Sequence, residues 1–245
     1  MTEIQSLARG LRILDALGEA SDGATISELA ALLGVDKGTA SRLVATLVSH
    51  GYAEKEESSR RFFPGSRVVS LSRSVLNRLP LREAAKPFLK DLMERTGECA
   101  HIAVYSQGKA LYIDQVESPA TLRVNAQVGT MNPLHCTALG KVLLAFCAAE
   151  YPSELESFTP ATITDPARLI AHIDQVRLLG YAVDDQEFDA GVRCIAAPVF
   201  DFRGKGIAAI GISGPASRIP SGKIPDLVNV VTSIAGELSE RMVRR

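Results

Sequence analysis

Apolar residues near the start of the chain fall into two short helical repeats joined by a Gly-Val-Asp sequence. Thr25 and Glu28 form a capping box, which predicts a helix that begins at Ile26. Gly34 supplies the left-handed residue that ends this helix, and Asp36 caps a second helix. Both helices keep the i, i+3, i+4, i+7 spacing of one apolar face, with Ile26, Leu29, Ala30 and Leu33 in the first and Ala40, Leu43, Val44 and Leu47 in the second.

A third amphipathic helix is predicted upstream, where Leu7, Leu11, Leu14 and Leu17 keep a helical spacing. Helices of roughly ten residues are too short to be stable alone, so we expect the three to share one core. The tight turn at Gly34 holds the last two at a steep angle, which is the helix-turn-helix arrangement. It leaves the outer face of the second helix uncovered.

The outer face of this second helix carries small and hydrogen-bonding residues. Gly38 and Arg42 lie opposite the apolar face, Thr39 and Ser41 flank them, and Lys37 lies at the helix start. Such a face fits closely into a major groove, where arginine makes a paired contact to guanine. Hydroxyl groups of this kind contact phosphates or base edges. The pattern predicts a DNA-reading helix.

The segment that follows predicts a hairpin. Two short extended pieces around Ser58-Ser59 would carry Arg60 and Arg61 to the DNA backbone. With the three helices, this hairpin completes a winged helix-turn-helix domain over residues 1–65. The alternative is a small helical subdomain without a DNA-binding role, because amphipathic helix pairs joined by glycine are common.

The charge balance of the first domain is not that of a typical nucleic-acid-binding protein. Residues 1–80 contain ten Lys or Arg and nine Asp or Glu, whereas a basic surface is the usual signature. We therefore expect Lys37, Arg42, Arg60 and Arg61 to gather on one side. A single module of this kind binds DNA weakly, which favours a dimer on two half-sites.

A connecting helix is predicted over residues 66–79, ending before Pro80. The rest of the chain, residues 80–245, alternates between helical and strand patterns. Helices are expected at 81–97 with an interruption near Pro87, at 136–147, at 167–180 and from 224 to 238, and strands at 99–105, 110–117, 121–128, around Tyr181, at 192–200 and at 206–213. The fold class is therefore α+β, a mixed or antiparallel sheet with flanking helices.

Composition limits the classes of function. The chain has 245 residues, 46% of them hydrophobic, and a formal net charge of -1, which excludes disorder. No apolar run reaches the ~20 residues that span a bilayer, so we expect a cytoplasmic protein that does not bind membranes. Four widely spaced cysteines predict reduced thiols, and the chain lacks phosphate-loop and dinucleotide-binding motifs. We expect no cofactor.

Five sequence blocks occur along the chain in the order typical of one protein family. They are QSLARGLRILDAL, ISELAALLGVDKGTASRLVATLVSHGY, LHCTALGKVLLA, GYAVDDQEFDAGVRCIAAPVFD and AAIGISGP. In this order the chain resembles the IclR type of bacterial transcriptional regulators. The resemblance implies a C-terminal GAF-like effector-binding domain and a homodimer or a tetramer made of two dimers. One departure is Phe62-Phe63-Pro64-Gly65, where the family usually has Tyr-x-Leu-Gly, and it leaves the wing geometry open.

The same resemblance implies an effector site in the C-terminal domain. The matching positions are Thr121 and Val124 on one strand, Ala138 and Leu139 at a helix start, Asp184, and then Val192, Cys194, Gly211 and Ser213. Backbone amides at a helix start attract a carboxylate, so a small organic acid is the expected effector. From residue types alone, these side chains would instead be core residues of strands. Many family members have Ser at the position of Gly211.

A rival interpretation is a cytosolic enzyme or a metal or thiol site with an incidental helical subdomain. Cys99 and His101 share one face of a strand, and His135, Cys136 and Cys194 are candidates to approach them. No motif with metal-ligand spacing is present, so we predict neither catalytic nor metal-binding residues. The favoured interpretation is a DNA-binding transcriptional regulator, repressor or activator, whose affinity for double-stranded operator DNA is controlled by the effector.

Overall fold

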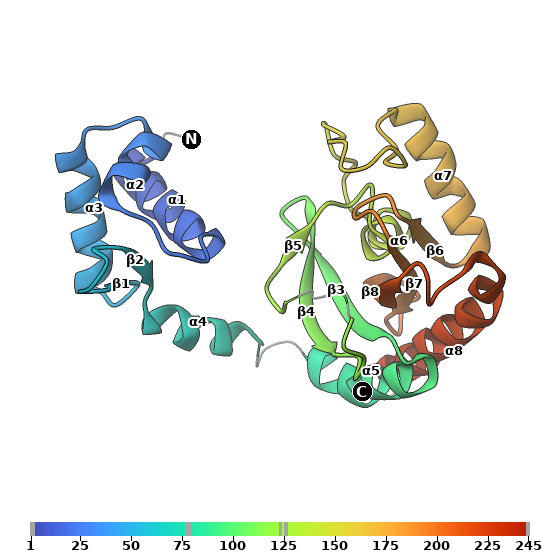
Figure 1. Cartoon of the computed structure of the whole chain (residues 1–245). Helices are drawn as coiled ribbons and strands as arrows, with labels where there is room; N and C mark the ends of the chain where they lie inside the picture. The colour runs from blue at the N-terminus through green and yellow to red at the C-terminus, as the bar shows by residue number, and fades with distance from the viewer. Residues whose placement is uncertain (1–2, 77–79, 123, 125–126, 244–245) are drawn as a thin grey trace. The chain divides into compact units, whose positions relative to one another are not determined.

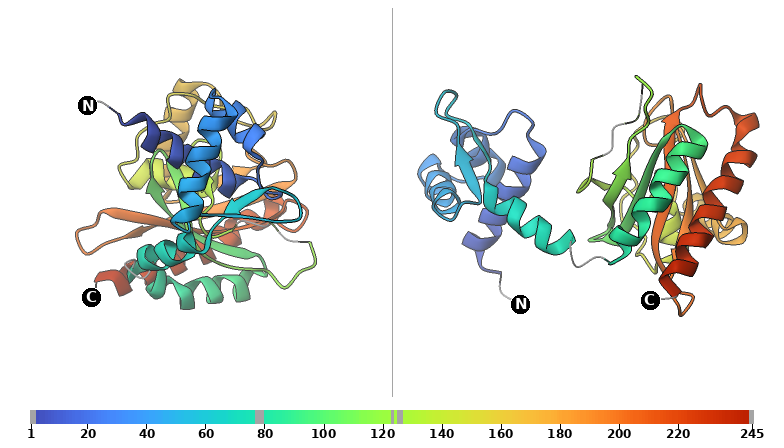
Figure 2. Two further views of the ribbon diagram at one scale, coloured as in Figure 1. Left: turned by 90° about the vertical axis from the view of Figure 1, so that its left-hand side faces the viewer. Right: turned by 90° about the horizontal axis from the view of Figure 1, so that it is seen from below.

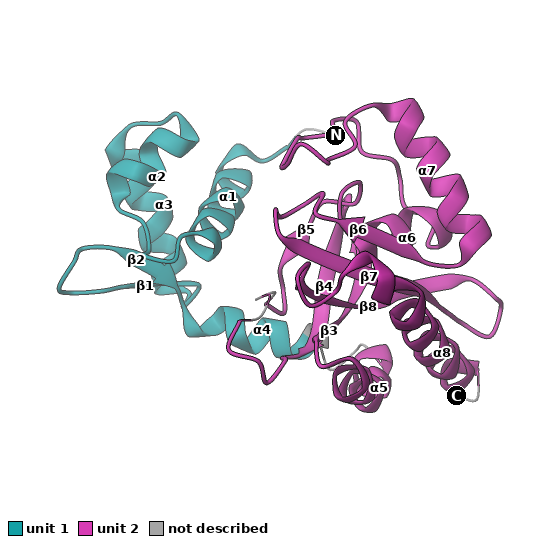
Figure 3. Cartoon of the chain, turned by 45° about the vertical axis from the view of Figure 1, so that its right-hand side comes forward, with its two compact units in different colours: residues 1–78 teal, residues 79–245 magenta. Residues whose placement is uncertain are grey.

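The computed structural model describes residues 3–76, 80–122, 124 and 127–243. It divides into two compact units, residues 1–78 and residues 79–245 (Figure 3). The division lies one residue before the predicted boundary of the effector domain. The connecting helix is grouped with the first unit. Within the described residues, no helix has the length and apolar character needed to cross a bilayer.

The first unit begins with three short helices, α1 (Gln5–Glu19), α2 (Ile26–Leu33) and α3 (Lys37–Ser49). The predicted caps of α2 and α3 are confirmed. The hydroxyl of Thr25 accepts a hydrogen bond from the N–H of Glu28 in a complete capping box. Gly34 has a φ of 64°, and the carboxylate of Asp36 accepts from the N–H of Thr39 at 2.9 Å.

The prediction for the face of α1 was wrong in part. Ile13 and Leu17 are buried in the shared core, whereas Leu7 and Leu11 are 60% and 53% exposed. The leucine spacing marks a second apolar stripe on a helix that is apolar on more than one side, and periodicity cannot tell which stripe faces inward. The core of the unit is completed by residues of α2, α3 and the wing, namely Leu29, Leu33, Val44 and Ala53.

The wing forms despite the departure from the family sequence. Strands β1 (Ala53–Lys55) and β2 (Phe62–Pro64) pair antiparallel, and Ala24 adds an isolated bridge to Phe62. A Cβ atom at Gly65 would lie 2.3 Å from the carbonyl oxygen of Gly51, so the close crossing of these two segments requires glycine. The connecting helix α4 covers Ser66–Leu76. Its predicted end before Pro80 lies outside the described residues.

The second unit is built on one six-stranded sheet. All neighbouring strands are antiparallel, in the order β5-β4-β3-β8-β7-β6. The strands are β3 (Cys99–Ser106), β4 (Lys109–Val116), β5 (Met131–Asn132), β6 (Ala182–Asp185), β7 (Val192–Phe200) and β8 (Gly206–Pro215). The α+β prediction is confirmed, with an antiparallel sheet.

Helices cover both faces of this sheet (Figures 1 and 2). On one face, α5 (Pro80–Thr96) and α8 (Ile224–Val243) pack side by side, and a 3-10 turn at Ser221–Lys223 precedes α8. On the other face, α6 (Ala138–Phe146) packs on β7 and β8 and is covered by α7 (Pro166–Leu179). Each layer has its own apolar core.

Two local predictions were wrong. Helix α5 continues through Pro87, because the proline is exposed while Leu81, Ala84 and Leu89 are buried around it. That packing outweighs the roughly 3 kcal/mol that an internal proline costs. Among the described residues of the segment 121–128, none belongs to a strand, and the edge strand forms later, at β5. Arg123, Asn125 and Ala126 lie outside the described residues.

Candidate functional site

The outer face of α3 is exposed in the isolated first unit. Lys37, Gly38, Ser41 and Arg42 are all exposed, and Thr39 is half-buried. The buried residues of the helix are Ala40 and Val44, which lie on its other side. The five predicted reading residues therefore share the face that the other helices leave open.

Thr39 has a local structural role. Its hydroxyl donates to the carboxylate of Asp36 at 2.7 Å and accepts from the guanidinium of Arg42 at 3.3 Å. The hydroxyl and backbone N–H of Thr39 together lower the pKa of Asp36. The cap at the start of α3 thus extends into a hydrogen-bonded chain that orients Arg42.

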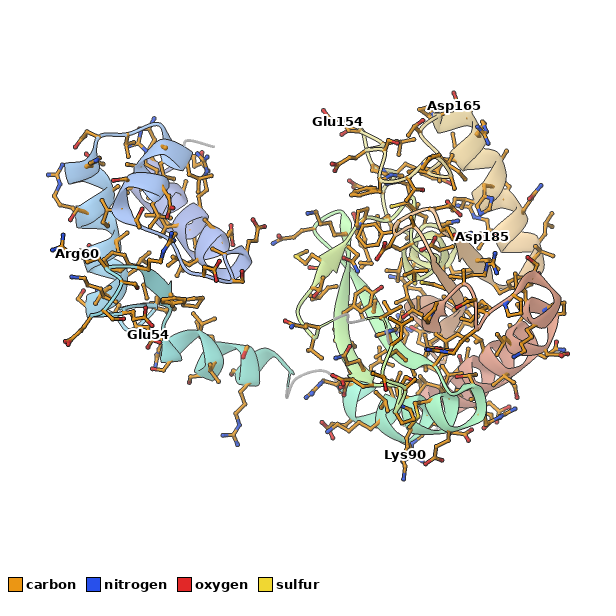
Figure 4. The ribbon with its side chains drawn as sticks, in the orientation of Figure 1. Glu54, Arg60, Lys90, Glu154, Asp165 and Asp185 are labelled. Carbon is orange, nitrogen blue, oxygen red and sulfur yellow. The ribbon has the colours of Figure 1, made fainter. Side chains whose placement is uncertain are left out.

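The two wing arginines differ. Arg60 is exposed on the loop between β1 and β2, with a φ of 56°, and is labelled in Figure 4. Arg61 is turned toward α2, where its guanidinium donates to the carbonyl of Gly23 at 2.9 Å and to the carboxylate of Glu28 at 3.2 Å. Arg61 therefore fastens the wing to the capping box of α2, a contact that sequence spacing does not reveal.

A cavity of about 150 Å³ opens in the second unit between the sheet, the start of α6 and the loop after β6. Eight of the nine predicted effector-site residues line it, namely Val124, Ala138, Leu139, Asp184, Val192, Cys194, Gly211 and Ser213. Thr121 is exposed and does not line the cavity.

The register of the sheet explains why these residues meet. Asp184 on β6 lies opposite Cys194 on β7, and Cys194 lies opposite Ser213 on β8. Two residues earlier on β8, Gly211 lies opposite His101 on β3. Because side chains two residues apart on a strand share a face, this set lines one side of the sheet beneath α6.

Sequence reasoning missed half of the cavity wall. The additional described residues are His101, Tyr112, Thr130, Asn132, Thr137, Phe188, Asp189 and Ile212. The rival interpretation places His101 and Cys194 in a thiol or metal site. In the structure, both line the cavity. The sequence does show that His101 shares a strand face with Cys99. It does not show that β3 lies beside β8, and only that strand order brings His101 to the cavity.

His101 is a buried, neutral side chain. Its Nε2 atom lies 2.5 Å from the hydroxyl of Ser213, and its Nδ1 atom has no hydrogen-bond partner among the residues that the structure describes. Burial lowers the pKa of His101 to about 4, so the ring is uncharged at pH 7. Tyr112 stacks edge-on against it, with ring centroids 5.5 Å apart.

Asp184 is the buried acid of the cavity. One of its oxygens accepts from the backbone N–H of Glu187 at 2.8 Å. Burial raises the pKa of Asp184 to about 6, against the opposing effects of that hydrogen bond and of Lys141. Burial also raises the pKa of Cys194 well above its usual range, so the adjacent thiol stays protonated.

A buried ion pair lies close to Asp184. The ammonium of Lys141 on α6 is fully buried and pairs with the carboxylate of Glu187. It also donates to the carbonyl of Val183 at 2.8 Å and lies 3.3 Å from Nε2 of His172. Burial, and then the charge of Lys141, lower the pKa of His172 to about 4. This cluster ties α6 to the loop that follows β6.

Gly211 is required by the sheet itself. A Cβ atom there would lie 2.2 Å from the carbonyl oxygen of Ile195 and 2.8 Å from the Cα atom of Ala196. A side chain such as that of serine would not fit here without a shift of β7.

The residues proposed for a thiol or metal site have other partners. The Sγ atom of Cys99 accepts from the N–H of Ser118 at 3.2 Å, and Nε2 of His135 lies 2.9 Å from the carbonyl of Glu156. Burial raises the pKa of Cys136 to about 12, which disfavours a thiolate nucleophile. Within the described parts of the chain, no group of three or more His, Cys, Asp or Glu is arranged to hold a metal ion.

The fold and the two sites together define a class, a DNA-binding regulator that combines a winged helix-turn-helix domain with a domain for a small ligand. Two family models match the chain: the IclR helix-turn-helix domain over residues 6–57 and the bacterial transcriptional regulator IclR C-terminal domain over residues 73–240. The chain belongs to the IclR family of transcriptional regulators.

Individual relatives agree with this assignment. The chain is 36% identical to the HTH-type transcriptional regulator BhcR of Paracoccus denitrificans, over 99% of this chain and 88% of that protein. The crystal structure of the Thermotoga maritima IclR is similar, with 30% identity, a TM-score of 0.74 and coverage of 98% and 99% of the two chains. An IclR homologue from Microbacterium hydrocarbonoxydans, solved with 4-hydroxybenzoate, shares the fold at 24% identity, a TM-score of 0.79 and coverage of 97% and 98%.

The family assignment confirms three predictions: the resemblance to IclR regulators, the fold class and the role in transcriptional regulation. It also agrees with the prediction that the chain is not an enzyme, because the matched family models and relatives carry the names of transcriptional regulators.

Proposed function

We propose that this regulator binds a roughly palindromic operator as a homodimer, and that a small organic acid in the cavity changes its operator affinity. The observation that carries the proposal is the coexistence of an open reading face on α3 with an enclosed cavity in a separate unit. A dimer of dimers is the expected higher assembly.

The reading residues support the DNA half of the proposal. Arg42 would contact guanine, while Lys37, Gly38, Thr39 and Ser41 bring the helix close to the groove. Arg60 would contact a phosphate of the backbone, and Arg61 would hold the wing in position through Glu28.

The cavity supports the effector half. Its volume of about 150 Å³ is close to that of a cavity known to hold benzene, so it suits an acid of that size. Ala138 and Leu139, the first residues of α6, line the cavity, and the N–H groups of a first helical turn have no acceptor within the helix. Thr137 already caps Gly140, which leaves the earlier N–H groups for a carboxylate.

An apolar groove on the first unit supports the homodimer. Its walls come from α1, α3 and α4, and its volume is about 700 Å³. The lining residues include Leu7, Leu11, Leu14, Leu43, Leu47, Tyr52 and Leu71. We assign this groove to a second copy of the chain, because a palindromic operator requires two reading helices in a fixed spacing.

The dimer is tested with Leu11→Asp, which places a charge in the groove. We expect the wild-type chain to sediment as a dimer or tetramer at micromolar concentration and the variant to have half that mass or less. The matched control is Leu32→Asp, at a leucine on α2 that is 49% exposed and does not line the groove. A wild-type monomer, or equal mass loss in both variants, would contradict this assignment.

Operator control is tested with the wild-type chain and fragments of the DNA upstream of its own gene. We expect one fragment to shift specifically in a salt-dependent manner and its affinity to change about 5- to 150-fold when a bound acid is added, the usual range of allosteric coupling. Equal affinity for all fragments at low salt would count against the DNA-binding half of the proposal. A specific shift that no small molecule alters would count against the effector half.

A further inference from the structure

The cavity has an unusual charge for a carboxylate site. Among the described residues that line it, two are carboxylic acids, Asp184 and Asp189, and none is Lys or Arg. Asp189 is exposed, whereas Asp184 is 2% exposed. Among the described residues, an acid that enters the cavity therefore meets a buried carboxyl group and no side-chain cation in the wall.

The groups around Asp184 do not neutralise it. The charge of Lys141 on α6 acts on Asp184, but it is matched by Glu187 in the loop after β6. His172 on α7 and His101 on β3 are neutral at pH 7. Burial raises the pKa of the remaining titratable neighbours, which therefore stay protonated: Cys136 before α6, Cys194 on β7 and Tyr112 on β4.

The size of the cavity brings the two acids together. Asp184 and the start of α6 line the same cavity of about 150 Å³, so a carboxylate bound at the N–H groups of α6 shares that small space with Asp184. Two carboxylates that share a buried site do not both stay ionised, and one of them retains a proton. The N–H groups at the start of α6 can stabilise the negative charge of one carboxylate. They leave the charge of the other carboxylate without a stabilising partner.

We propose that the effector is a small monocarboxylic acid that binds together with one proton, which its carboxylate and the carboxyl group of Asp184 share. The proton comes from solvent, and no other bond forms or breaks. This inference rests on the proposed effector function of the same cavity. It makes Asp184 the residue that couples acid binding to a proton, and it makes operator control sensitive to pH.

The sign of the pH dependence follows directly. Asp184 has a pKa of about 6 in the empty cavity, and a bound carboxylate raises that pKa further. Binding is then strongest where Asp184 is already protonated and weakens above pH 6. The dissociation constant is expected to rise about tenfold from pH 7 to pH 8 and about 50-fold from pH 6 to pH 8, provided the ligand itself stays ionised.

The test is titration calorimetry of the full-length chain with benzoate, 4-hydroxybenzoate and lactate, each at pH 6, 7 and 8. Two buffers with different heats of ionisation give the number of protons taken up, which we expect to be close to one per acid at pH 7.5. The matched neutral probes are benzamide, 4-hydroxybenzamide and lactamide. They are expected to bind, if at all, with no proton uptake and no dependence on pH.

Asp184→Asn gives an independent readout. The amide resembles the protonated acid, so the variant is expected to bind the acids without proton uptake and equally well at pH 6 and pH 8. The control is Asp226→Asn, at an exposed aspartate in the first turn of α8, which should keep the wild-type pH profile. The wild-type proton count decides the question even if Asp184→Asn fails to fold.

The outcomes separate this inference from the effector function on which it rests. Acids that bind with no proton uptake overturn the inference alone, as do amides that bind and alter operator affinity while the acids do not. If neither class binds at any pH, both this inference and the small-acid effector proposal fail. Uptake of one proton in the wild type and its loss in Asp184→Asn support both.

Discussion

Replacing Lys141 with methionine is expected to lower the free energy of unfolding of the second unit by about 3–5 kcal/mol, the usual cost of breaking a buried ion pair. The ammonium of Lys141 is fully buried, and the variant leaves the carboxylate of Glu187 without its cation. One oxygen of that carboxylate already has no hydrogen-bond partner in the described part of the chain. A loss of this size is a large fraction of the stability of a typical domain.

The measurement is denaturant unfolding followed separately for each unit, since two units need not unfold together. The matched control is Lys90→Met, which breaks an exposed ion pair with Glu94 on the surface of α5 and should change stability by no more than about 0.5 kcal/mol (Figure 4). Adding Glu187→Gln to Lys141→Met should recover much of the lost free energy of unfolding, because it removes the unpaired negative charge of Glu187. Equal effects of Lys141→Met and Lys90→Met would refute a structural role for the buried pair.

Replacing Arg42 with alanine is expected to abolish the preference for operator DNA while the fold stays intact. A bidentate contact to guanine contributes about 1–3 kcal/mol at each half-site. In a dimer the loss counts twice, so operator affinity should fall about 30-fold or more. Arg42 is exposed, and the hydrogen bond from its guanidinium to Thr39 is dispensable for the helix cap because Asp36 accepts from Thr39 directly.

Two variants isolate the cause of that loss in a gel-shift or anisotropy titration. Arg42→Lys keeps the positive charge and should retain non-specific binding without restoring the preference for the operator. Arg203→Ala removes an exposed arginine of the second unit, between β7 and β8, and should leave operator binding unchanged. Operator affinity that is unaffected by Arg42→Ala would mean that another surface reads the DNA.

Local signals in the sequence were sufficient for most secondary structure. The Thr25–Glu28 box, Gly34 and Asp36 placed both helices of the helix-turn-helix because caps act over three or four residues. The helix predicted at 167–180 agrees with α7 to within one residue at each end, where Asp165 and Gly180 form the caps. The failures came where packing decided: Pro87 lies inside α5, and the segment 121–128 contains no strand among its described residues.

Contacts across the wing were beyond prediction. Nothing within a few residues of Arg61 distinguishes it from Arg60, yet Arg61 binds Glu28, a residue 33 positions away. The inward face of α1 was equally undetermined, since the helix carries one apolar stripe for the core and a second, exposed one. Both questions depend on where other elements lie.

The sequence by itself determined where most helices and strands lie and, through its family motifs, eight of the residues around the cavity. Only the tertiary structure decided that His101 and Tyr112 join them, that Lys141 is neutralised by Glu187, and that Asp184 is the buried acid of a wall whose described residues include no Lys or Arg. The physical reason is the sequence separation over which each kind of interaction acts. Caps and periodicity act along a few residues, whereas burial and charge pairing depend on antiparallel register between strands more than a hundred residues apart, such as β3 and β8.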